Sequence, residues 1–456
     1  MSSLVITVMG SAILALLVAG YIGQKYLPAP KPKIVGIDLG TTYSCIGAYH
    51  AVSGKVDIIP DGDGHLCIPS VVAYRDTGDV LVGYDAVNQA DHNPSNTFYD
   101  AKRFIGKKFS LEEFQREASR YPFHIHRDGV DGSVKFYTTH HPDLHISPET
   151  IGSEILLTLK KSAEAHFKFP ISKAVISVPA EFDEEQRNCT KNAALFAGIE
   201  VIRVINEPTA AALAYGLHQK GGAQDVLVVD LGGGTLDVSL LDIQGGMFLT
   251  RAMAGNNHLG GQDFNERLKS HITAEVEKKF RRKLEDPEDV QALRAAVENL
   301  KINLTLYNSA RLQLDLVSLK DEDDNNNNNK RHTNNNNNKN NNAYNFELEV
   351  TRDLFEKINR DLFERVIEPI KLVLEAGELS TEEVEEIVLV GGSTRIPKVR
   401  QLVSEYFNNK QLNVAIDPEL AVVTGVSIQA GIVGGAWPLS VSAVESKTSV
   451  KKLYVR

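Results

Sequence analysis

The chain contains little cysteine and lacks several short motifs that are typical of metal or nucleotide enzymes. Its 456 residues include three cysteines, Cys45, Cys67 and Cys189, with no Cys-x-x-Cys pair among them. We therefore expect neither a disulfide framework nor a zinc ribbon. The zincin motif His-Glu-x-x-His and the P-loop motif Gly-x-x-x-x-Gly-Lys-Ser/Thr are both absent, so these two enzyme classes have no support in the sequence.

An excess of positive charge is also lacking. The chain has 49 lysines and arginines against 59 aspartates and glutamates, which gives a net charge of −10. Nucleic-acid binders usually present a basic surface, so this class is not expected. Hydrophobic residues make up 42% of the chain, which excludes a wholly disordered protein. At about 150 residues per domain, the length predicts two or three domains with a large core.

Charged side chains are missing from residues 2–24, and most of these residues are Val, Ile, Leu, Ala or Gly. A stretch of about 20 apolar residues can cross a bilayer as a helix. It can equally be the apolar region of a signal peptide, with small residues near a cleavage site at Ala19 and Gly20. We therefore interpret residues 1–24 as a signal peptide or a signal anchor, followed by a Pro- and Lys-rich linker at 25–33.

The location of the rest of the chain, called the body below, depends on whether this first segment is cleaved or retained. If the segment stays as an anchor, its first lysines follow the apolar run and would place the body in the cytosol. Cleavage would release the body into the secretory lumen. Two glycosylation acceptor patterns, which begin at Asn188 and Asn303, favour the lumen. We expect a lumenal protein of the endoplasmic reticulum or microsomes, with membrane contact only through the N-terminal segment.

After the linker, short Val/Ile-rich runs alternate with long helical patterns, which is typical of an α/β fold. Residues 321–342 break this alternation, because they are acidic and then mostly asparagine, with almost no apolar side chain. Such a segment cannot offset the entropy of ordering, so we predict a disordered surface insertion within a loop. A self-associating tract is the alternative interpretation of this segment.

An apolar strand that ends in aspartate and is followed by a Gly/Thr turn occurs twice. The first copy covers 34–42 and contains Asp38, and the second covers 226–235 and contains Asp230. In both copies a second strand follows the turn. This duplication predicts two similar lobes, each larger than a small domain.

Glycine-rich turns after a strand expose backbone N–H groups that can surround phosphate oxygens. A carboxylate beside phosphates would repel them, so Asp38 and Asp230 are better explained as holding a cation such as Mg²⁺, directly or through water. Ordinary hairpin turns are the alternative. A third strand and turn at 387–397 carries Gly-Gly and then Arg395, whose flat cation can stack on a base. Three such turns predict a nucleotide held between two lobes.

Together these segments resemble the nucleotide-binding domain of the stress-70 heat-shock chaperones, in the superfamily that includes actin and sugar kinases. The resemblance covers residues 32 to about 437, and within the family it is strongest to a microsome-associated member that consists of the ATPase core alone. The matching segments are GIDLGTTYS at 36–44, DAKRFIG at 100–106, VPA at 178–180, VINEPTAA at 204–211, DLGGGTLD at 230–237 and VGGSTRIP at 390–397.

The resemblance implies an α/β, actin-like ATPase fold, in which two ribonuclease H-like lobes surround a nucleotide cleft. Lobe I would span 34–220 and lobe II 221–415, with the disordered insertion inside lobe II. Residues 416–437 would form a closing helix that returns to lobe I, and residues 438–456 would form a tail.

The resemblance also implies roles for individual residues, with ATP or ADP, Mg²⁺ and K⁺ as cofactors. Pro179 would relay the nucleotide state between the lobes. The catalytic residues would be Lys102, Glu207, Asp230 and Asp38, and the metal ligands would be Asp38, Glu207, Asp230 and Asp237. The nucleotide would be bound by Gly40, Thr41, Thr42, Tyr43, Gly232, Gly233, Gly234, Thr235, Glu298, Lys301, Thr305, Gly391, Gly392, Ser393 and Arg395.

The implied activity is Mg-dependent, in-line attack of water on the γ-phosphate of ATP, in a chaperone core that lacks the peptide-binding domain and serves protein folding or processing. Two positions depart from the family pattern: Ile302 replaces an arginine that lies against the adenine, and Glu419 replaces an aspartate. The implied partners are co-chaperones, namely J-domain proteins and nucleotide-exchange factors, or ubiquitin-like proteins, and the chain would be a monomer. The alternatives are a non-catalytic, nucleotide-dependent docking module and, more remotely, a sugar or metabolite kinase on the same fold.

Overall fold

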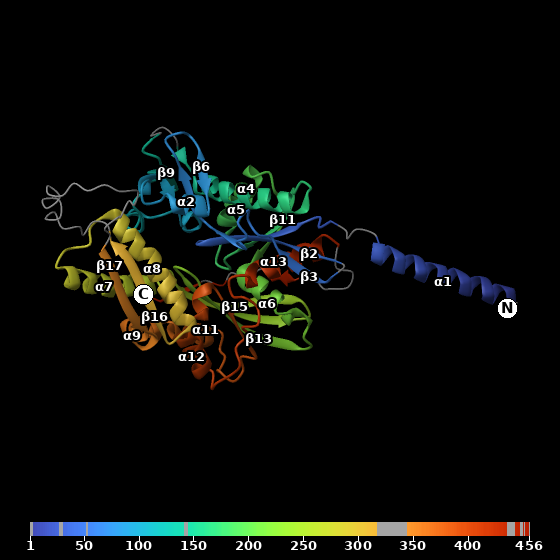
Figure 1. Cartoon of the computed structure of the whole chain (residues 1–456). Coiled ribbons are helices and arrows are strands. Elements are labelled where there is room, and N and C mark those ends of the chain that lie inside the picture. Colours follow the sequence, from blue (N-terminus) through green and yellow to red (C-terminus); the bar gives the residue numbers. More distant parts are fainter. Residues whose placement is uncertain are drawn as a thin grey trace, which may run out of the picture.

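The computed structural model describes residues 3–26, 31–51, 53–140, 145–316, 344–435, 443–446, 450 and 452–455. The body consists of two lobes, each built on a β-sheet, and helix α1 (Ser3–Tyr26) lies apart from them (Figure 1). Among the helices in these ranges, none has both the length and the apolar character needed to cross a membrane. The insertion predicted at 321–342 falls outside the described residues.

The sheet of lobe I has the strand order β12–β11–β1–β2–β3, and β4 also pairs with β2. Strand β1 runs parallel to β11 and antiparallel to β2. Most residues of β1 and β2 are buried, because helices cover the faces of this sheet. The strands are β1 (Val35–Leu39), β2 (Tyr43–His50), β3 (Lys55–Ile58), β4 (Cys67–Pro69), β11 (Lys173–Val178) and β12 (Glu200–Asn206).

The sheet of lobe II repeats this arrangement. Its order is β18–β13–β14–β15, in which β13 runs parallel to β18 and antiparallel to β14. Asp38 lies opposite Cys45 in the first hairpin, and Asp230 lies opposite Asp237 in the second. The predicted duplication is therefore visible in the topology as well as in the motif. The strands are β13 (Ala223–Leu231), β14 (Leu236–Gln244), β15 (Met247–Asn256) and β18 (Glu386–Val390).

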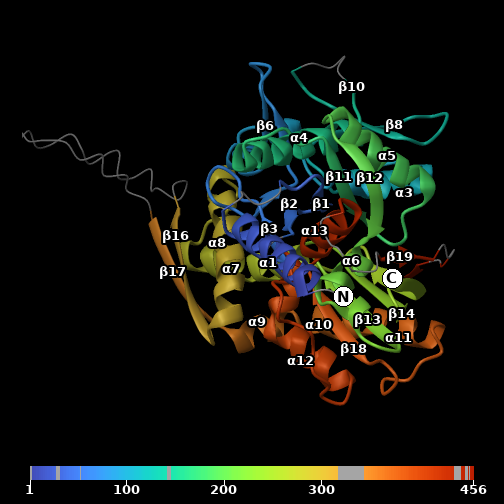
Figure 2. The ribbon, with the colours of Figure 1, turned by 90° about the vertical axis from the view of Figure 1, so that its right-hand side faces the viewer.

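Two helices lie between the sheets and join the lobes (Figure 2). Helix α6 (Glu207–Ala214) follows β12 directly, and α13 (Ala421–Val433) packs on α6, β1 and β2. Gly425 of α13 lies so close to α6 that a Cβ atom would overlap the carbonyl oxygen of Ala210. Small residues let the two backbones approach closely, and a core cluster rich in alanine, valine and isoleucine connects both sheets here.

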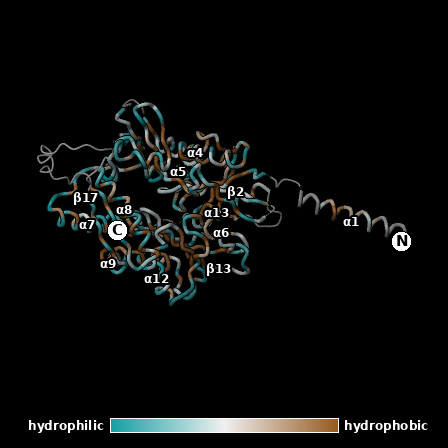
Figure 3. The backbone as a smooth tube through the Cα atoms, in the orientation of Figure 1, coloured by the Kyte–Doolittle hydropathy of each residue, from teal (hydrophilic) through white to brown (hydrophobic). Residues whose placement is uncertain are grey.

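Further helices cover the outer faces of the sheets, and small sheets extend each lobe. Hydrophobic residues concentrate in the interior, for example around β2, and hydrophilic residues in the outer loops (Figure 3). The remaining helices are α2 (Tyr84–Asn88), α3 (Leu111–Ala118), α4 (Pro148–Phe167), α5 (Glu184–Phe196), α7 (Gly261–Phe280), α8 (Pro287–Leu306), α9 (Arg352–Ile358), α10 (Arg360–Arg365), α11 (Ile367–Ala376) and α12 (Pro397–Tyr406), with short 3-10 turns η1 (Pro94–Asn96), η2 (Ala101–Arg103), η3 (Leu217–Gln219) and η5 (Gly392–Arg395). The remaining strands are β5 (Val72–Tyr74), β6 (Val80–Val82), β7 (Thr97–Phe98), β8 (His124–Arg127), β9 (Val134–Tyr137), β10 (His145–Ile146), β16 (Ser309–Leu316), β17 (Tyr344–Thr351), β19 (Val444–Glu445) and β20 (Leu453–Tyr454).

Local sequence explains where several of these helices begin. Ser147 accepts a hydrogen bond from the backbone N–H of Thr150 at the start of α4, and Asp183 accepts one from Gln186 at the start of α5. Such caps satisfy backbone donors that have no partner within the helix. Both helices pack in lobe I, where α4 contacts α5 and the sheet.

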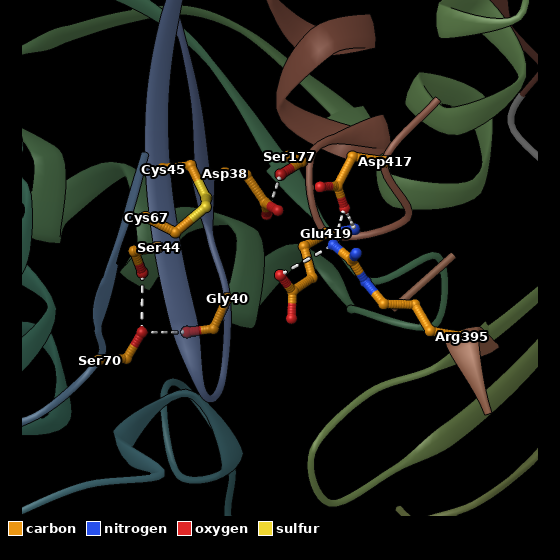
Figure 4. Close-up of a disulfide and its surroundings, with 10 residues drawn as sticks. All are labelled: Asp38, Gly40, Ser44, Cys45, Cys67, Ser70, Ser177, Arg395, Asp417 and Glu419. Atoms are coloured by element: carbon orange, nitrogen blue, oxygen red, sulfur yellow. Dashed lines mark hydrogen bonds and ion pairs between the residues drawn. A yellow bond between two sulfur atoms is a disulfide. The ribbon is translucent and has the colours of Figure 1, made fainter. Parts of the chain in front are cut away.

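Cysteine chemistry differs from the sequence expectation at one place. Antiparallel pairing of β2 with β4 sets Cys45 opposite Cys67, with Cα atoms 4.5 Å apart, and the two residues form a disulfide (Figure 4). Cys189 stays free. One bond is not a framework, but the cysteines do bond in this fold. Their separation of 22 residues in the sequence could not predict the bond. The two cysteines come together because of the register in which β2 pairs with β4.

Candidate functional site

A cavity of about 1560 Å³ lies between the lobes and is lined by residues of both. The Gly/Thr turns of the two lobes face each other across it, since a Cβ atom on Gly233 would lie 2.7 Å from Oγ1 of Thr42. The residues predicted for catalysis, metal binding and nucleotide binding all line this cavity, and so does Pro179 at the end of β11. The structure therefore brings together residues that lie far apart along the chain.

A lysine and a glutamate form a buried ion pair in this cavity. The Nζ atom of Lys102 donates a hydrogen bond to Oε1 of Glu207 at 2.5 Å, and the two side chains are only 10% and 18% exposed. Burial lowers the pKa of Lys102, but the carboxylates of Glu207 and Asp38 outweigh it, so that this pKa lies above its ordinary value. The lysine is therefore a fixed positive charge at neutral pH.

The carboxylates around this lysine have pKa values above their ordinary range. Burial raises the pKa of Asp38, although Lys102 and a 2.8 Å hydrogen bond from Oγ of Ser177 oppose the change. Burial also raises the pKa of Asp230 well above its ordinary value, and neighbouring carboxylates add to that rise. Burial raises the pKa of Glu207 to about 7, against the field of Lys102.

This cluster fits a hard divalent cation. Carboxylate oxygens and water are the ligands that Mg²⁺ prefers in proteins. Burial disfavours the charged form of these carboxylates, neighbouring carboxylates add to this effect, and a bound divalent ion would stabilise the charged form. The residues that could hold it, directly or through water, are Asp38, Glu207, Asp230 and Asp237.

The two glycine-rich turns are held in place by hydrogen bonds from outside each turn. In the second turn, the carbonyl of Gly232 accepts a bond from the N–H of Gly261 at 3.0 Å, at the start of α7. In the first turn, Oγ of Ser70 donates to the carbonyl of Gly40 at 2.8 Å and lies 2.8 Å from Oγ of Ser44 (Figure 4). Turns fixed in this way can receive phosphate oxygens without reorganising.

The third turn supplies a flat cation at the rim of the cavity. Arg395 forms ion pairs with Asp417 and with Glu419, the latter at 3.4 Å between Nη2 and Oε2 (Figure 4). The side chain of Arg395 is 41% exposed and lines the cavity, and a guanidinium of this kind can stack on a planar base. Glu419 departs from the family pattern but keeps a carboxylate in this ion pair.

Helix α8 forms a further wall of the cavity. Nζ of Lys301 donates to Oε2 of Glu298 at 2.9 Å and to the carbonyl of Gly261 at 3.3 Å. Thr305 lies one turn further along the same helix. Ile302 lines the cavity and is 49% exposed, so this position offers a base an apolar contact and no cation.

Comparison with known proteins decides the family. The model of the family described as "Hsp70 protein" matches residues 34–445. This chain belongs to the Hsp70 family. It is 50% identical to "Heat shock 70 kDa protein 13" of Homo sapiens over 96% of both chains, and 51% identical to the protein of that name in Mus musculus with the same coverage. It is 42% identical over 88% of its length to a "Heat shock 70 kDa protein" of Neurospora crassa and covers 58% of that longer chain.

Membership of the Hsp70 family confirms the resemblance seen in the motifs and the α/β, actin-like fold that it implied. The family is one of chaperones with a nucleotide-binding domain, and the matched residues include both lobes and α13. The roles predicted for individual residues, and the domain boundaries, stay predictions.

Several charged residues that line this Hsp70 cavity were not among the predicted site residues, and Glu181 and Lys452 are two of them. Glu181 follows the Val-Pro-Ala segment, and Lys452 comes from the end of the chain. A place next to a matched motif could have pointed to Glu181. Lys452 lies in a short polar segment without a motif, and only the pairing of β20 with β15 brings it to the cavity.

Proposed function

We propose that this chain binds ATP with Mg²⁺ in the cavity between its lobes and hydrolyses it to ADP and phosphate. The observation that carries this proposal is the buried pair of Lys102 and Glu207, surrounded by further carboxylates, at the place where two glycine-rich turns face each other. In phosphoryl transfer the protein mainly positions groups and stabilises charge. This arrangement supplies both functions.

Each part of the site has a role in this proposal. The backbone of the two turns would hold the phosphates, and the ammonium of Lys102 would stabilise the charge that grows on the γ-phosphate. Asp230 and Glu207 would orient the attacking water, since both carboxylates line the cavity beside Lys102. Mg²⁺ bound to the carboxylates would neutralise the phosphate oxygens and order them for in-line attack.

Turnover measurements on the purified full-length chain test the proposal. We expect ATP hydrolysis above background that requires Mg²⁺, with turnover reduced about 100-fold or more in Asp230→Asn. Lys283→Met is the matched surface control, since the side chain of Lys283 is 80% exposed and lies outside the cavity. A chain that binds ATP but hydrolyses none, with the same result in Asp230→Asn, would overturn hydrolysis.

One observation favours a second candidate, a docking module that binds ATP without hydrolysing it. Lys452 contacts Asp237, so the chain's own end already occupies part of the carboxylate cluster. Such a module would present co-chaperones or ubiquitin-like proteins with two nucleotide states. Tight Mg·ATP binding with no turnover, together with nucleotide-dependent binding of a J-domain protein or nucleotide-exchange factor, would select this candidate over the ATPase.

We also propose that the body lies in the lumen of the endoplasmic reticulum and assists protein folding or processing there. The disulfide between Cys45 and Cys67 supports this location, because such bonds form and persist in oxidising compartments. Asn188 and Asn303, which begin the two glycosylation patterns, are both exposed on helices. Protease protection and glycosidase treatment of microsomes, with N-terminal sequencing of the mature chain, test the proposal. A protease-accessible and unglycosylated body would overturn it.

A further inference from the structure

The last part of the chain that the structure describes, residues 443–446, 450 and 452–455, contains two short strands that lie along the edge strand of lobe II. Val444 and Glu445 of β19 pair in parallel with the start of β15, and Leu453 and Tyr454 of β20 pair in parallel with its end. Figure 2 shows β19 beside the strands of lobe II. The backbone of this segment is therefore a part of the lobe II sheet at two places.

Two charged side chains of the same segment reach across to lobe I. Glu445 accepts a hydrogen bond from the backbone N–H of Asn206 at 2.8 Å and another from the side chain of Thr209. Asn206 immediately precedes Glu207, the partner of Lys102. The segment thus contacts the end of β12 and the first turn of α6, which carry one of the proposed catalytic groups.

Lys452 is the second side chain of this segment that contacts lobe I, and it does so inside the nucleotide cavity. Its side chain is only 3% exposed, and Nζ donates to Oε1 of Glu181 at 2.9 Å and to Oδ1 of Asp237. Glu181 belongs to lobe I and Asp237 to lobe II, so one ammonium joins both lobes. Oδ1 of Asn257 lies 3.5 Å from the same nitrogen.

The charge of this ammonium matters because the cavity is crowded with carboxylates. Burial lowers the pKa of Lys452, but Asp237 and Glu181 outweigh it, so that this pKa lies above its ordinary value and the group stays charged. Without it, the carboxylates of Asp237 and Glu181, which are 35% and 27% exposed, would lie near each other with no cation between them. Two negative charges in that position repel each other and attract a cation from solution.

We propose that Lys452 is a built-in cation of the nucleotide site, delivered by the pairing of β19 and β20 with β15, and that it positions Asp237 and Glu181 across the two lobes. It is a positioning residue, since it acts through the carboxylates that it contacts. If the cavity binds a nucleotide as proposed, the ammonium of Lys452 also takes the place of a monovalent cation from solution beside Asp237. This last consequence rests on the proposed function, while the docking of the segment does not.

The docking can be tested without nucleotide, on the full-length chain by hydrogen exchange. In Lys452→Met, Asp237 and Glu181 lose the ammonium between them, so we expect the amides of residues 443–446 and 452–455 to exchange about tenfold or more faster than in the wild-type chain. Lys452→Arg should restore part of the protection, and Lys283→Met should leave it unchanged. Equal protection in the wild-type chain and Lys452→Met overturns the proposal.

The cation role is tested by the affinity for Mg·ADP, measured by calorimetry in KCl and in N-methylglucamine chloride of equal concentration. We expect the wild-type affinity to change less than about twofold between the two salts, and the Lys452→Met affinity to fall about tenfold in N-methylglucamine and to recover in K⁺. Equal salt dependence of the two proteins overturns this role. A wild-type chain that binds no nucleotide contradicts the proposed function, and the hydrogen-exchange result then decides the docking by itself.

Discussion

Nζ of Lys102 lies 2.5 Å from Oε1 of Glu207, although 105 positions separate the two residues in the chain. Lys102 belongs to the short turn η2, and Glu207 begins α6, which packs between the sheets. The pair is therefore positioned by two independent parts of lobe I. An ion pair with so little exposure sits where electrostatic effects are strongest, and this relationship leads to the first two predictions.

Lys102→Met should remove most of the ATP turnover while the chain still folds. Methionine has a similar length and fits a buried position, but it cannot stabilise the charge that develops on the γ-phosphate. We expect the turnover number to fall about 100-fold to 1000-fold, with a smaller loss of ATP affinity. Single-turnover kinetics and calorimetry separate the two effects, and Lys398→Met on the surface of α12 is the control. Turnover within twofold of the wild-type value would contradict the role of Lys102.

The stability of the Mg-free chain should depend on pH through Glu207. Burial raises its pKa from 4.5 to about 7, so the folded state holds this proton more tightly than the unfolded state. That stabilisation is fully present below pH 4.5 and is lost as the pH rises to about 7. We expect the free energy of unfolding to fall by about 1 to 3 kcal/mol across this window because of Glu207.

Urea denaturation of the wild-type chain and of Glu207→Gln isolates this contribution, because glutamine keeps the shape but does not titrate. We expect Glu207→Gln to gain in relative stability as the pH rises from 4.5 to 7, in the absence of Mg²⁺ and nucleotide. The prediction fails when the stability difference between the two proteins is the same at both ends of the window.

Reduction of the disulfide between Cys45 and Cys67 should destabilise lobe I. The bond closes a loop of 22 residues, and loss of this constraint on the unfolded chain is worth about 3 kcal/mol in the chain-entropy description. We expect Cys67→Ser to lower the free energy of unfolding by about this amount under oxidising conditions. Both cysteines line the nucleotide cavity, so Mg·ADP affinity should fall as well.

Cys189→Ser is the control for this prediction, since Cys189 is free and lies on α5 outside the cavity. Reductant should change the stability of the wild-type chain and of Cys189→Ser alike, and that of Cys67→Ser not at all. Denaturation curves with and without reductant measure this directly. A reductant effect that persists in Cys67→Ser would show that another group is responsible.

Gly425→Ala should be strongly destabilising. Its methyl group would overlap the carbonyl oxygen of Ala210, so α6 and α13 would have to move apart. Overpacking of this kind costs about 3 kcal/mol, and here the displaced helix also carries Glu207. The control is Gly62→Ala, because a Cβ atom at Gly62 meets nothing within 4 Å. Thermal unfolding of both variants tests the prediction, and equal melting temperatures would contradict it.

The parts of the site that could be predicted are those whose residues lie together in short stretches of the sequence. Asp38 and Asp230 each end an apolar strand before a Gly/Thr turn, so strand, turn and carboxylate are visible together in a few residues. The repeat of this pattern predicted two lobes, and four strands of each sheet share one arrangement, β11–β1–β2–β3 in lobe I and β18–β13–β14–β15 in lobe II. Local sequence determines such turns, because glycine permits close backbone approaches, as at Gly40, where a Cβ atom would overlap the carbonyl oxygen of Tyr43.

The parts that escaped prediction depend on pairing between distant strands. The partner of Cys45 became visible only in the register of β2 with β4. Lys452 reached the cavity through two short strands in a polar segment, where no apolar periodicity indicates a strand. The catalytic roles of Lys102 and Glu207 were expected from family resemblance alone, and their ion pair was not predicted, since a lone lysine carries no sign of burial in its sequence context.

The docking of β19 and β20 on β15 has a consequence for solubility. Strand β15 (Met247–Asn256) would otherwise form the edge of the lobe II sheet, with a row of unpaired backbone donors and acceptors. An uncovered edge of that length can add a strand from another molecule and start aggregation. Strands β19 and β20 protect both ends of this edge, and the side chain of Lys452, directly before β20, contacts carboxylates of the cavity. The colloidal behaviour of the chain and the charge balance of its cavity therefore depend on the same short segment.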